Sequence, residues 1–293
     1  MNKVLIIGGS GLLGSSLVPL FDDAFFTYNN TQINESNAFR LDISDRNSLK
    51  FLLKKLEPNT IIVTAALTDV EKCEIYPEIA ARINSEPFQY LVPYLKKNNG
   101  RLIQISTDYV FSGDNGNYGE NDARNPVNMY GKTKMDAENI IIGSGINYTI
   151  IRTSGIFGAN EATGKINFFT WLYNNLKNGN KISLVTDQFY SPVLNTILSN
   201  SILEIFEREI SGIIHFSSSD RISRFEFGTL TARSFRFDEK SIQLAKMEDM
   251  KWKARRPMDS SLNNNKAMRE LINKPVSVSE EIGMIKKLLE NEN

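Results

Sequence analysis

The fold is decided by the stretch Val4-Leu5-Ile6-Ile7-Gly8-Gly9-Ser10-Gly11-Leu12-Leu13-Gly14. Its four apolar residues are typical of a parallel strand that is buried on both faces. The glycines at positions 8, 11 and 14 then let the backbone approach a pyrophosphate, whose charge the N-terminus of the next helix stabilises. With helical spacing over residues 17–21, this order favours a dinucleotide-binding loop over a turn that only packs a helix on a strand.

Strands and helices alternate along the first half of the chain. Apolar strands are expected at 24–28, 60–63, 101–106 and 148–152, and helices at 78–97 and 127–142. This alternation predicts an α/β fold with a Rossmann-type doubly wound parallel sheet. We assign residues 1–160 to the NAD(P)-binding Rossmann domain. Residues 161–293 are expected to form mainly a smaller C-terminal substrate-binding lobe, with some segments that return to the Rossmann domain.

The carboxyl ends of the strands supply candidates for the cofactor site, because doubly wound sheets bind ligands there. Asn29 follows strand 24–28, where NAD-selective sites commonly carry an acid, so a 2′-phosphate is not repelled and NADPH gains a slight advantage over NADH. Asp42 is a candidate for the adenine amino group or a turn-capping carboxylate, and Ser44 is expected to cap the next helix. The expected cofactor-binding set is Gly8, Ser10, Gly11, Leu12, Leu13, Asn29, Asp42, Ile43, Ala65, Ala66, Thr68, Tyr130 and Lys134.

Tyr130 and Lys134 form a candidate acid/base pair. They lie four residues apart in the expected helix 127–142, so their side chains share one face. A free tyrosine has a pKa of about 10, and a fixed cation nearby stabilises the phenolate and lowers that pKa. The pair can therefore serve a carbonyl–alcohol interconversion; a surface tyrosine beside a solvated lysine is the alternative.

Composition argues against several other classes of function. The 293 residues carry 34 basic and 34 acidic side chains, and no basic tract points to nucleic acid as a partner. No apolar run approaches the ~18–20 residues that span a membrane. Cys73 is the only cysteine, which excludes an intramolecular disulfide and favours a cytoplasmic setting. His215, the only histidine, is expected to be structural, and no metal-binding residues are assigned.

Several stretches occur in an order that is similar to one known family. Besides the glycine loop they are Ala65-Ala66-Leu67-Thr68-Asp69-Val70-Glu71-Lys72-Cys73-Glu74, Ser106-Thr107-Asp108-Tyr109-Val110-Phe111-Ser112-Gly113, Asn128-Met129-Tyr130-Gly131-Lys132-Thr133-Lys134, Arg152-Thr153-Ser154, Asp187-Gln188 before Ser191-Pro192, and Arg255-Arg256-Pro257 with Ser260 and Leu262. Together they resemble the dTDP-4-dehydrorhamnose reductase family of the extended short-chain dehydrogenase/reductase superfamily. The resemblance covers nearly the whole chain.

The resemblance implies a reaction and a role for each catalytic residue. Hydride would pass to the C4 keto carbon of a nucleotide-linked 6-deoxyhexose, and dTDP-4-dehydro-L-rhamnose would become dTDP-L-rhamnose. Tyr130 would protonate the developing alkoxide, and Lys134 would lower the tyrosine pKa and hold the nicotinamide ribose. Thr107 would hydrogen-bond the same substrate oxygen. The implied substrate-binding set is Thr107, Tyr109, Asn167 and Arg256, with Arg256 at a phosphate; Mg²⁺ and a homodimer are compatible with the family.

Two departures from the family pattern lie on the substrate side. Gly155 stands where many members carry a tryptophan that packs near the substrate. The usual Asp-Gln-x-Gly-x-Pro-Thr is here Asp187-Gln188-Phe189-Tyr190-Ser191-Pro192-Val193. Both departures bear on the identity of the sugar more than on the class of reaction.

Alternative activities remain within the same resemblance. A 4,6-dehydratase normally carries Asp-Glu after the catalytic threonine, whereas Tyr109 follows Asp108 here. Another nucleotide-sugar reductase, or an epimerase that retains its cofactor, fits the same motifs. A non-catalytic, NADP-binding regulatory subunit of methionine adenosyltransferase also resembles this family, although the intact Thr107, Tyr130 and Lys134 favour an enzyme.

Overall fold

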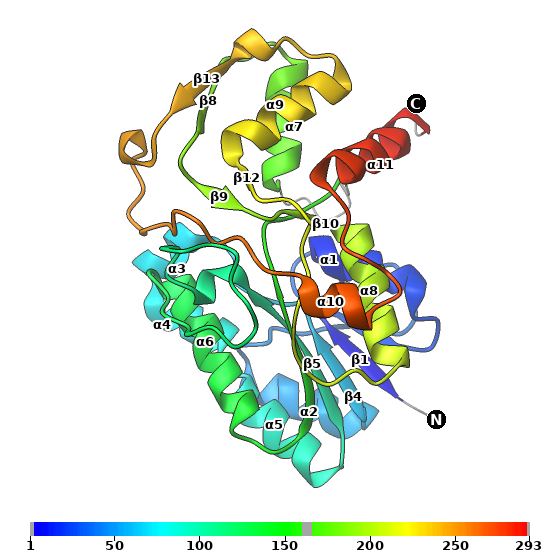
Figure 1. Cartoon of the computed structure of the whole chain (residues 1–293). Helices are drawn as coiled ribbons and strands as arrows, with labels where there is room; N and C mark the ends of the chain where they lie inside the picture. The colour runs from blue at the N-terminus through cyan, green and yellow to red at the C-terminus, as the bar shows by residue number, and fades with distance from the viewer. Residues whose placement is uncertain (1–2, 160–165, 292–293) are drawn as a thin grey trace.

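The structure is a computed structural model that describes residues 3–159 and 166–291, so the domain boundary expected at 160/161 lies outside the described residues. Figure 1 shows a larger lobe built around a sheet and a smaller lobe that contains α7 (Phe168–Lys177) and α9 (Arg224–Phe235). No helix within the described ranges is both long and apolar enough to cross a bilayer.

The larger lobe contains the predicted parallel sheet. Within the described residues its seven strands lie in the order β11 (Gly212–His215), β6 (Asn147–Thr153), β5 (Arg101–Thr107), β4 (Thr60–Val63), β1 (Val4–Ile7), β2 (Phe25–Tyr28) and β3 (Ala38–Arg40). Every neighbouring pair is parallel, which confirms the Rossmann-type fold. The edge strand β3 was not predicted, because its three residues are half-buried or exposed and lack an apolar run.

Apolar side chains alternate between the two faces of the sheet. Ile6 packs in one apolar cluster, whereas its neighbours Leu5 and Ile7 pack in the other. Helices α1 (Leu12–Leu17), α8 (Asn195–Glu207) and α10 (Asn265–Glu270) cover the first face, and α2 (Arg46–Leu56), α5 (Phe88–Lys97) and α6 (Met129–Ile142) cover the second. Two shorter helices, α3 (Val70–Ile75) and α4 (Pro77–Asn84), pack against α6.

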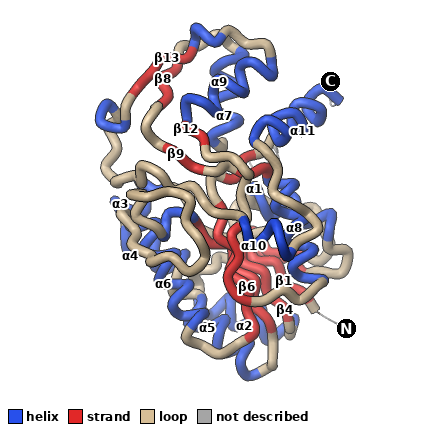
Figure 2. Tube along the Cα trace, in the orientation of Figure 1, coloured by secondary structure: helices blue, strands red, loops and turns tan. Residues whose placement is uncertain are grey.

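The smaller lobe has an aromatic core and short strand pairs. The pairs are β8 (Ile182–Val185) with β13 (Ile242–Ala245), β9 (Phe189–Tyr190) with β12 (Ile222–Ser223), and β7 (Ile156–Phe157) with β10 (Val193–Leu194). Four of these short strands are the red segments around β8, β9, β12 and β13 in Figure 2. Strands of two residues leave no periodic signal in a sequence, so β7, β9, β10 and β12 were not predicted. The C-terminal helix α11 (Val278–Asn291) completes this core.

Two helix starts differ from the predictions. Helix α1 begins at Leu12, directly after the glycine turn, and gives way to a 3-10 turn over Val18–Leu20, which contains Pro19 and so lacks one backbone donor. The prediction that Ser44 caps α2 is wrong. Asp45 caps this helix, because its carboxylate accepts hydrogen bonds from the backbone N–H groups of Asn47 and Ser48.

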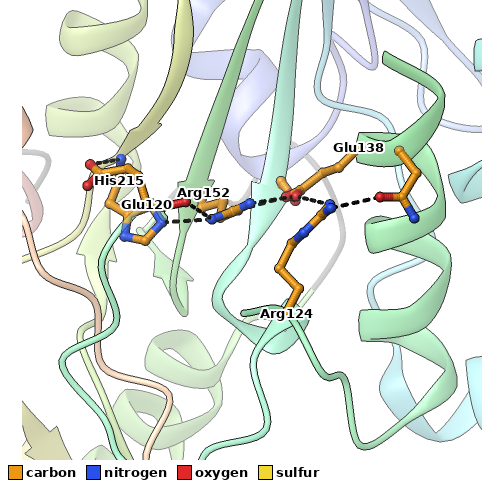
Figure 3. Close-up of polar contacts among 7 residues, drawn as sticks. Glu120, Arg124, Glu138, Arg152 and His215 are labelled. Carbon is orange, nitrogen blue, oxygen red and sulfur yellow. Dashed lines mark hydrogen bonds and ion pairs between the residues drawn. The ribbon is translucent and has the colours of Figure 1, made fainter. Parts of the chain in front are cut away.

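A buried carboxylate, Glu138 on α6, joins that helix to the sheet (Figure 3). Glu138 Oε1 accepts from Ser106 Oγ at 2.5 Å and from Arg152 Nε at 3.0 Å. Its Oε2 accepts from Arg152 Nη2 and Arg124 Nη1, both at 2.8 Å. Arg152 Nη1 also hydrogen-bonds His215 Nε2 at 3.2 Å. Burial and Arg152 lower the pKa of His215 to about 3, so this histidine is a neutral structural residue.

We expect Glu138→Ala to lower the free energy of unfolding by about 3–5 kcal/mol, because Arg152 would stay buried without its counter-ion. The matched control is Lys132→Ala on an exposed position of the same helix, which should change stability by no more than about 0.5 kcal/mol. Urea unfolding of both variants measures the difference. Equal stabilities would show that the buried network does not hold α6.

A second buried acid makes stability depend on pH. Glu281 on α11 accepts a hydrogen bond from Leu194 N at 3.1 Å, and burial raises its pKa to about 9. Glu281 therefore keeps a proton in the folded chain and releases it on unfolding. The stability that this protonated carboxyl contributes is lost as pH rises from about 4.5 towards 9.

We compare the free energy of unfolding of Glu281→Gln with that of the native chain. We expect this difference to move in favour of the variant by up to about 3 kcal/mol between pH 6 and pH 8, at most about 1.4 kcal/mol per pH unit. The neighbouring exposed variant Glu280→Gln should show no such change over this range. Denaturant titrations at the two pH values provide the measurement, and a pH-independent difference for Glu281→Gln would contradict it.

Candidate active site

Helix α6 lies unusually close to the turn that follows β5. Asn128 caps the helix, and its Oδ1 accepts a hydrogen bond from Gly131 N at 2.9 Å. A Cβ at Gly131 would lie 2.0 Å from the carbonyl oxygen of Tyr109, so a residue without a side chain is required there. This approach brings Tyr130 and Lys134, one turn apart, to the carboxyl end of β5.

The three side chains predicted to be catalytic meet between β5 and α6. Thr107, the last residue of β5, hydrogen-bonds the Tyr130 phenol and donates its hydroxyl proton to Asp108 Oδ1 at 2.9 Å. Lys134 Nζ donates to the carbonyl oxygen of Ile105 at 2.6 Å, two residues before Thr107 on the same strand. One strand and one helix therefore fix all three groups.

Asp108 fixes the Thr107 hydroxyl in turn. This carboxylate is 3% exposed, and its Oδ2 accepts from Ser154 Oγ at 2.6 Å and Ser260 Oγ at 2.5 Å. Burial raises the pKa of Asp108, and the three hydroxyl donors oppose that rise. Neither serine was predicted to support the site, because they lie 46 and 152 residues from Asp108 in the chain.

The lowering of the tyrosine pKa by Lys134 stays a prediction, because another influence dominates the pKa of Tyr130 in this structure. Burial raises the pKa of the Tyr130 phenol, and the hydrogen bond with Thr107 opposes only part of that rise. Lys134 is itself 3% exposed, and burial lowers the pKa of its ammonium to about 8, although Glu138 acts in the opposite direction. At neutral pH the phenol therefore keeps its proton, as a proton donor must.

The glycine loop packs directly on the end of β4. Gly8 has a φ of +103°, and a Cβ there would lie 2.6 Å from Ala65 N. A Cβ at Gly14 would lie 2.0 Å from the carbonyl oxygen of Gly8. These two glycines are thus required for packing whatever the loop binds. The same contact brings two predicted cofactor segments, residues 8–13 and 65–68, side by side.

The other predicted cofactor residues lie along the same edge of the sheet. Asn29 is exposed directly after β2, and Thr68 is exposed after β4. Asp42 is exposed and accepts from Ser44 N at 2.9 Å and Ser44 Oγ at 2.7 Å, so the structure shows the turn-capping role. Ile43 is buried in the apolar cluster that contains Leu5.

Sequence reasoning missed Asn84, which ties the loop after β4 to α6. This side chain is 1% exposed; its Oδ1 accepts from Leu67 N at 2.8 Å, and its Nδ2 donates to Leu67 O and Thr133 Oγ1, both at 3.1 Å. A polar residue on the apolar face of a predicted helix was the available signal. Its partners, 17 and 49 residues away, leave no local pattern.

A cavity of about 340 Å³ adjoins this site and brings together residues of both lobes. The ring of Tyr109, one of its lining residues, contacts the Tyr130 ring edge-on at 5.9 Å. Tyr109 Oη accepts a hydrogen bond from Gln188 Nε2 at 3.2 Å. The cavity is lined by Tyr109, Phe168, Trp171, Ser183, Leu184, Val185, Gln188, Arg224, Met250, Trp252 and Arg256. Two cations and several aromatic rings thus surround it.

Two of the substrate-side residues have structural partners of their own. Asn167 caps α7, where its Oδ1 accepts from Phe169 N and Thr170 N and its Nδ2 donates to Gly158 O at 2.8 Å. At Gly155, where φ is +45°, a Cβ would lie 2.6 Å from Cε2 of Tyr190. The Tyr190 ring therefore occupies the space that a side chain at position 155 would need.

Comparison with known proteins places these features in one family. The model of the family described as "RmlD substrate binding domain" matches residues 1–290. The chain is 30% identical to a dTDP-4-dehydrorhamnose reductase of Aggregatibacter actinomycetemcomitans over 78% of this chain and 77% of that protein. It is 28% identical to methionine adenosyltransferase 2 subunit beta of Danio rerio, over 80% and 74% of the two chains.

Solved structures agree. The crystal structure of a hypothetical dTDP-4-dehydrorhamnose reductase from Sulfolobus tokodaii is 35% identical, with a TM-score of 0.84 over 94% of this chain and 98% of that one. The dTDP-4-dehydrorhamnose reductase of Bacillus anthracis, in complex with NADP, is 26% identical, with a TM-score of 0.86 over 99% of both chains. The chain therefore belongs to the RmlD substrate-binding family, that of the dTDP-4-dehydrorhamnose reductases.

Proposed function

We propose that this protein reduces the C4 ketone of a nucleotide-linked 6-deoxyhexose, with dTDP-4-dehydro-L-rhamnose as substrate and dTDP-L-rhamnose as product. The observation that carries the proposal is that Thr107 and Tyr130 lie in contact beside a cavity formed by both lobes. Bound NADPH or NADH would supply the hydride. The glycine loop, Ala65, Ala66 and the region of Asn29 are the groups proposed to hold it.

The chain's own residues supply the proton and the alignment. Tyr130 donates its phenolic proton to the oxygen that becomes the alcohol, and the raised pKa keeps that proton in place until the oxygen gains charge. Thr107, whose hydroxyl proton goes to Asp108 Oδ1 in the structure, would turn that proton to the same substrate oxygen as a second hydrogen-bond donor. Lys134 lies one turn from Tyr130, and its ammonium would hold the nicotinamide ribose.

The cavity supports a nucleotide sugar as the substrate. Arg224 and Arg256 supply two cations for a diphosphate, and Trp171 and Trp252 supply flat apolar surfaces for a base. Tyr109 lines the cavity and its ring contacts that of Tyr130, so the sugar would lie beside Tyr109. We keep Asn167 as a candidate sugar contact through the second N–H of its amide.

Tyr130→Phe should lower kcat for the oxidation of NADPH with dTDP-4-dehydro-L-rhamnose by about 10²–10⁴-fold, because the general acid is removed. Tyr148→Phe, a tyrosine on β6 outside the site, should leave kcat within about twofold. Absorbance at 340 nm follows both reactions. If neither NADPH nor NADH is oxidised when the substrate is added, the proposed reaction is wrong. If Tyr130→Phe reacts at the native rate, the proposed role of Tyr130 is wrong.

For the cofactor we expect kcat/KM with NADPH to be at least equal to that with NADH, because the residue after β2 is Asn29 and not an acid. Asn29→Asp should lower kcat/KM for NADPH by about tenfold or more and spare NADH, through repulsion of the 2′-phosphate. The charge-matched control is Asn200→Asp, an exposed position on α8. A strong NADH preference in the native chain would contradict the inference.

Assays with and without EDTA test whether Mg²⁺ is needed.

A second candidate is a non-catalytic, NADP-binding subunit of methionine adenosyltransferase. The observation that favours it is the likeness to the subunit beta of Danio rerio. This candidate predicts NADPH binding without turnover of any keto-sugar, and a stable complex with the catalytic synthetase subunit on size-exclusion chromatography. Turnover that depends on Tyr130, without such a complex, would exclude it.

A further inference from the structure

One wall of the cavity is an irregular segment of the smaller lobe, here called the strap and defined as residues 246–257. It leaves β13 and runs down to the region of α3, as the orange trace of Figure 1 shows. Residues 250–258 form neither helix nor strand. Because no backbone ladder sets its path, side chains from other segments must hold the strap in place.

The strap is attached at both ends. At its start, Met247 N donates to Asp187 Oδ1 at 2.9 Å. At its end, Glu71 on α3 accepts hydrogen bonds from Lys253 N at 2.8 Å and, more weakly, from Ala254 N at 3.4 Å.

The end of the strap is also tied to the catalytic helix. Asn128 Nδ2 donates to the carbonyl oxygen of Arg255 at 2.8 Å, while Asn128 Oδ1 caps α6. Glu74, on the same helix as Glu71, accepts from Met129 N at 3.0 Å. Strap, α3 and the start of α6 therefore form one hydrogen-bonded unit.

The two terminal nitrogens of the Arg256 guanidinium differ in their partners. Its Nη2 donates to Glu71 Oε1 at 2.9 Å, and its guanidinium lies 5.3 Å from the centre of the Trp252 ring. Its Nη1 is buried and has no hydrogen-bond partner among the described residues, and the side chain lines the cavity. A buried, unpaired guanidinium nitrogen beside a cavity requires an acceptor, and an anionic ligand is the chemistry that provides one.

We propose that Glu71 is a positioning residue for substrate binding, which fixes the strap and holds Arg256 so that Nη1 meets the diphosphate of a nucleotide ligand. This inference rests on the proposed function. Glu71 contacts the strap and is not among the described residues that line the cavity, so it would act through Arg256. It should therefore affect the binding of the nucleotide and leave the chemistry at Tyr130 unchanged.

The test uses Glu71→Gln in the full chain, because glutamine replaces one of the two acceptor oxygens by NH₂ and cannot hold both Lys253 N and Arg256. We expect the Kd of dTDP, measured by calorimetry, and the KM of the nucleotide sugar to rise about tenfold. kcat should stay within about twofold, and the Kd of NADPH should not change. Glu78→Gln, an exposed acid on the neighbouring α4, is the matched control and should alter none of these values.

A double-mutant cycle separates positioning from a general effect on the fold. In an Arg256→Ala background, Glu71→Gln should weaken dTDP binding by less than twofold, because its effect passes through the missing guanidinium. Full additivity, or native dTDP affinity in Glu71→Gln, would overturn the role of Glu71 and leave the proposed function intact. A native chain that binds no dTDP would overturn both.

Discussion

The arrangement of this protein depends on a single buried carboxylate, that of Glu138. It is fully buried and accepts hydrogen bonds from Ser106, which precedes Thr107 on β5, and from Arg152 on β6. Since Glu138 lies one turn beyond Lys134 on α6, the carboxylate fixes the helix that carries Tyr130 against the strand that carries Thr107 (Figure 3). A buried ion pair adds little net stability, but it tolerates only one geometry. That geometry is what a site built from two elements needs.

Burial then acts in opposite directions on the two titratable groups of the site. It raises the pKa of Tyr130 and lowers that of Lys134, since the charged form is the phenolate in one case and the ammonium in the other. The sequence argument considered only the attraction between the two charges, whereas desolvation is the largest influence on the pKa of Tyr130. The outcome suits a reductase, whose tyrosine must begin the reaction with its proton.

The sheet and the pair of Tyr130 and Lys134 could be predicted from local patterns. The hydrogen bonds between distant segments could not, for a physical reason. The apolar run at 4–7, the glycines and the spacing of Tyr130 and Lys134 are signals within a few residues, and they led to the sheet and the pair. Asn84 and Glu71 act on partners up to 49 and 185 residues away, through single hydrogen bonds that leave no periodicity. The cap of α2 shows the limit even locally, because Ser44 and Asp45 are both good caps and only geometry selects Asp45.

The departure at Gly155 is best understood through the smaller lobe. A side chain at this position would collide with Tyr190 from β9. Arg224, which lines the cavity, has its Cζ 3.8 Å from the centre of the same ring. The aromatic group beside the end of β6 therefore comes from the smaller lobe and not from β6 itself. The Tyr190 ring packs on Phe227 of α9 and on Arg224, which lines the cavity. Changes in the smaller lobe can thus alter the shape of the cavity without disturbing Thr107, Tyr130 or Lys134.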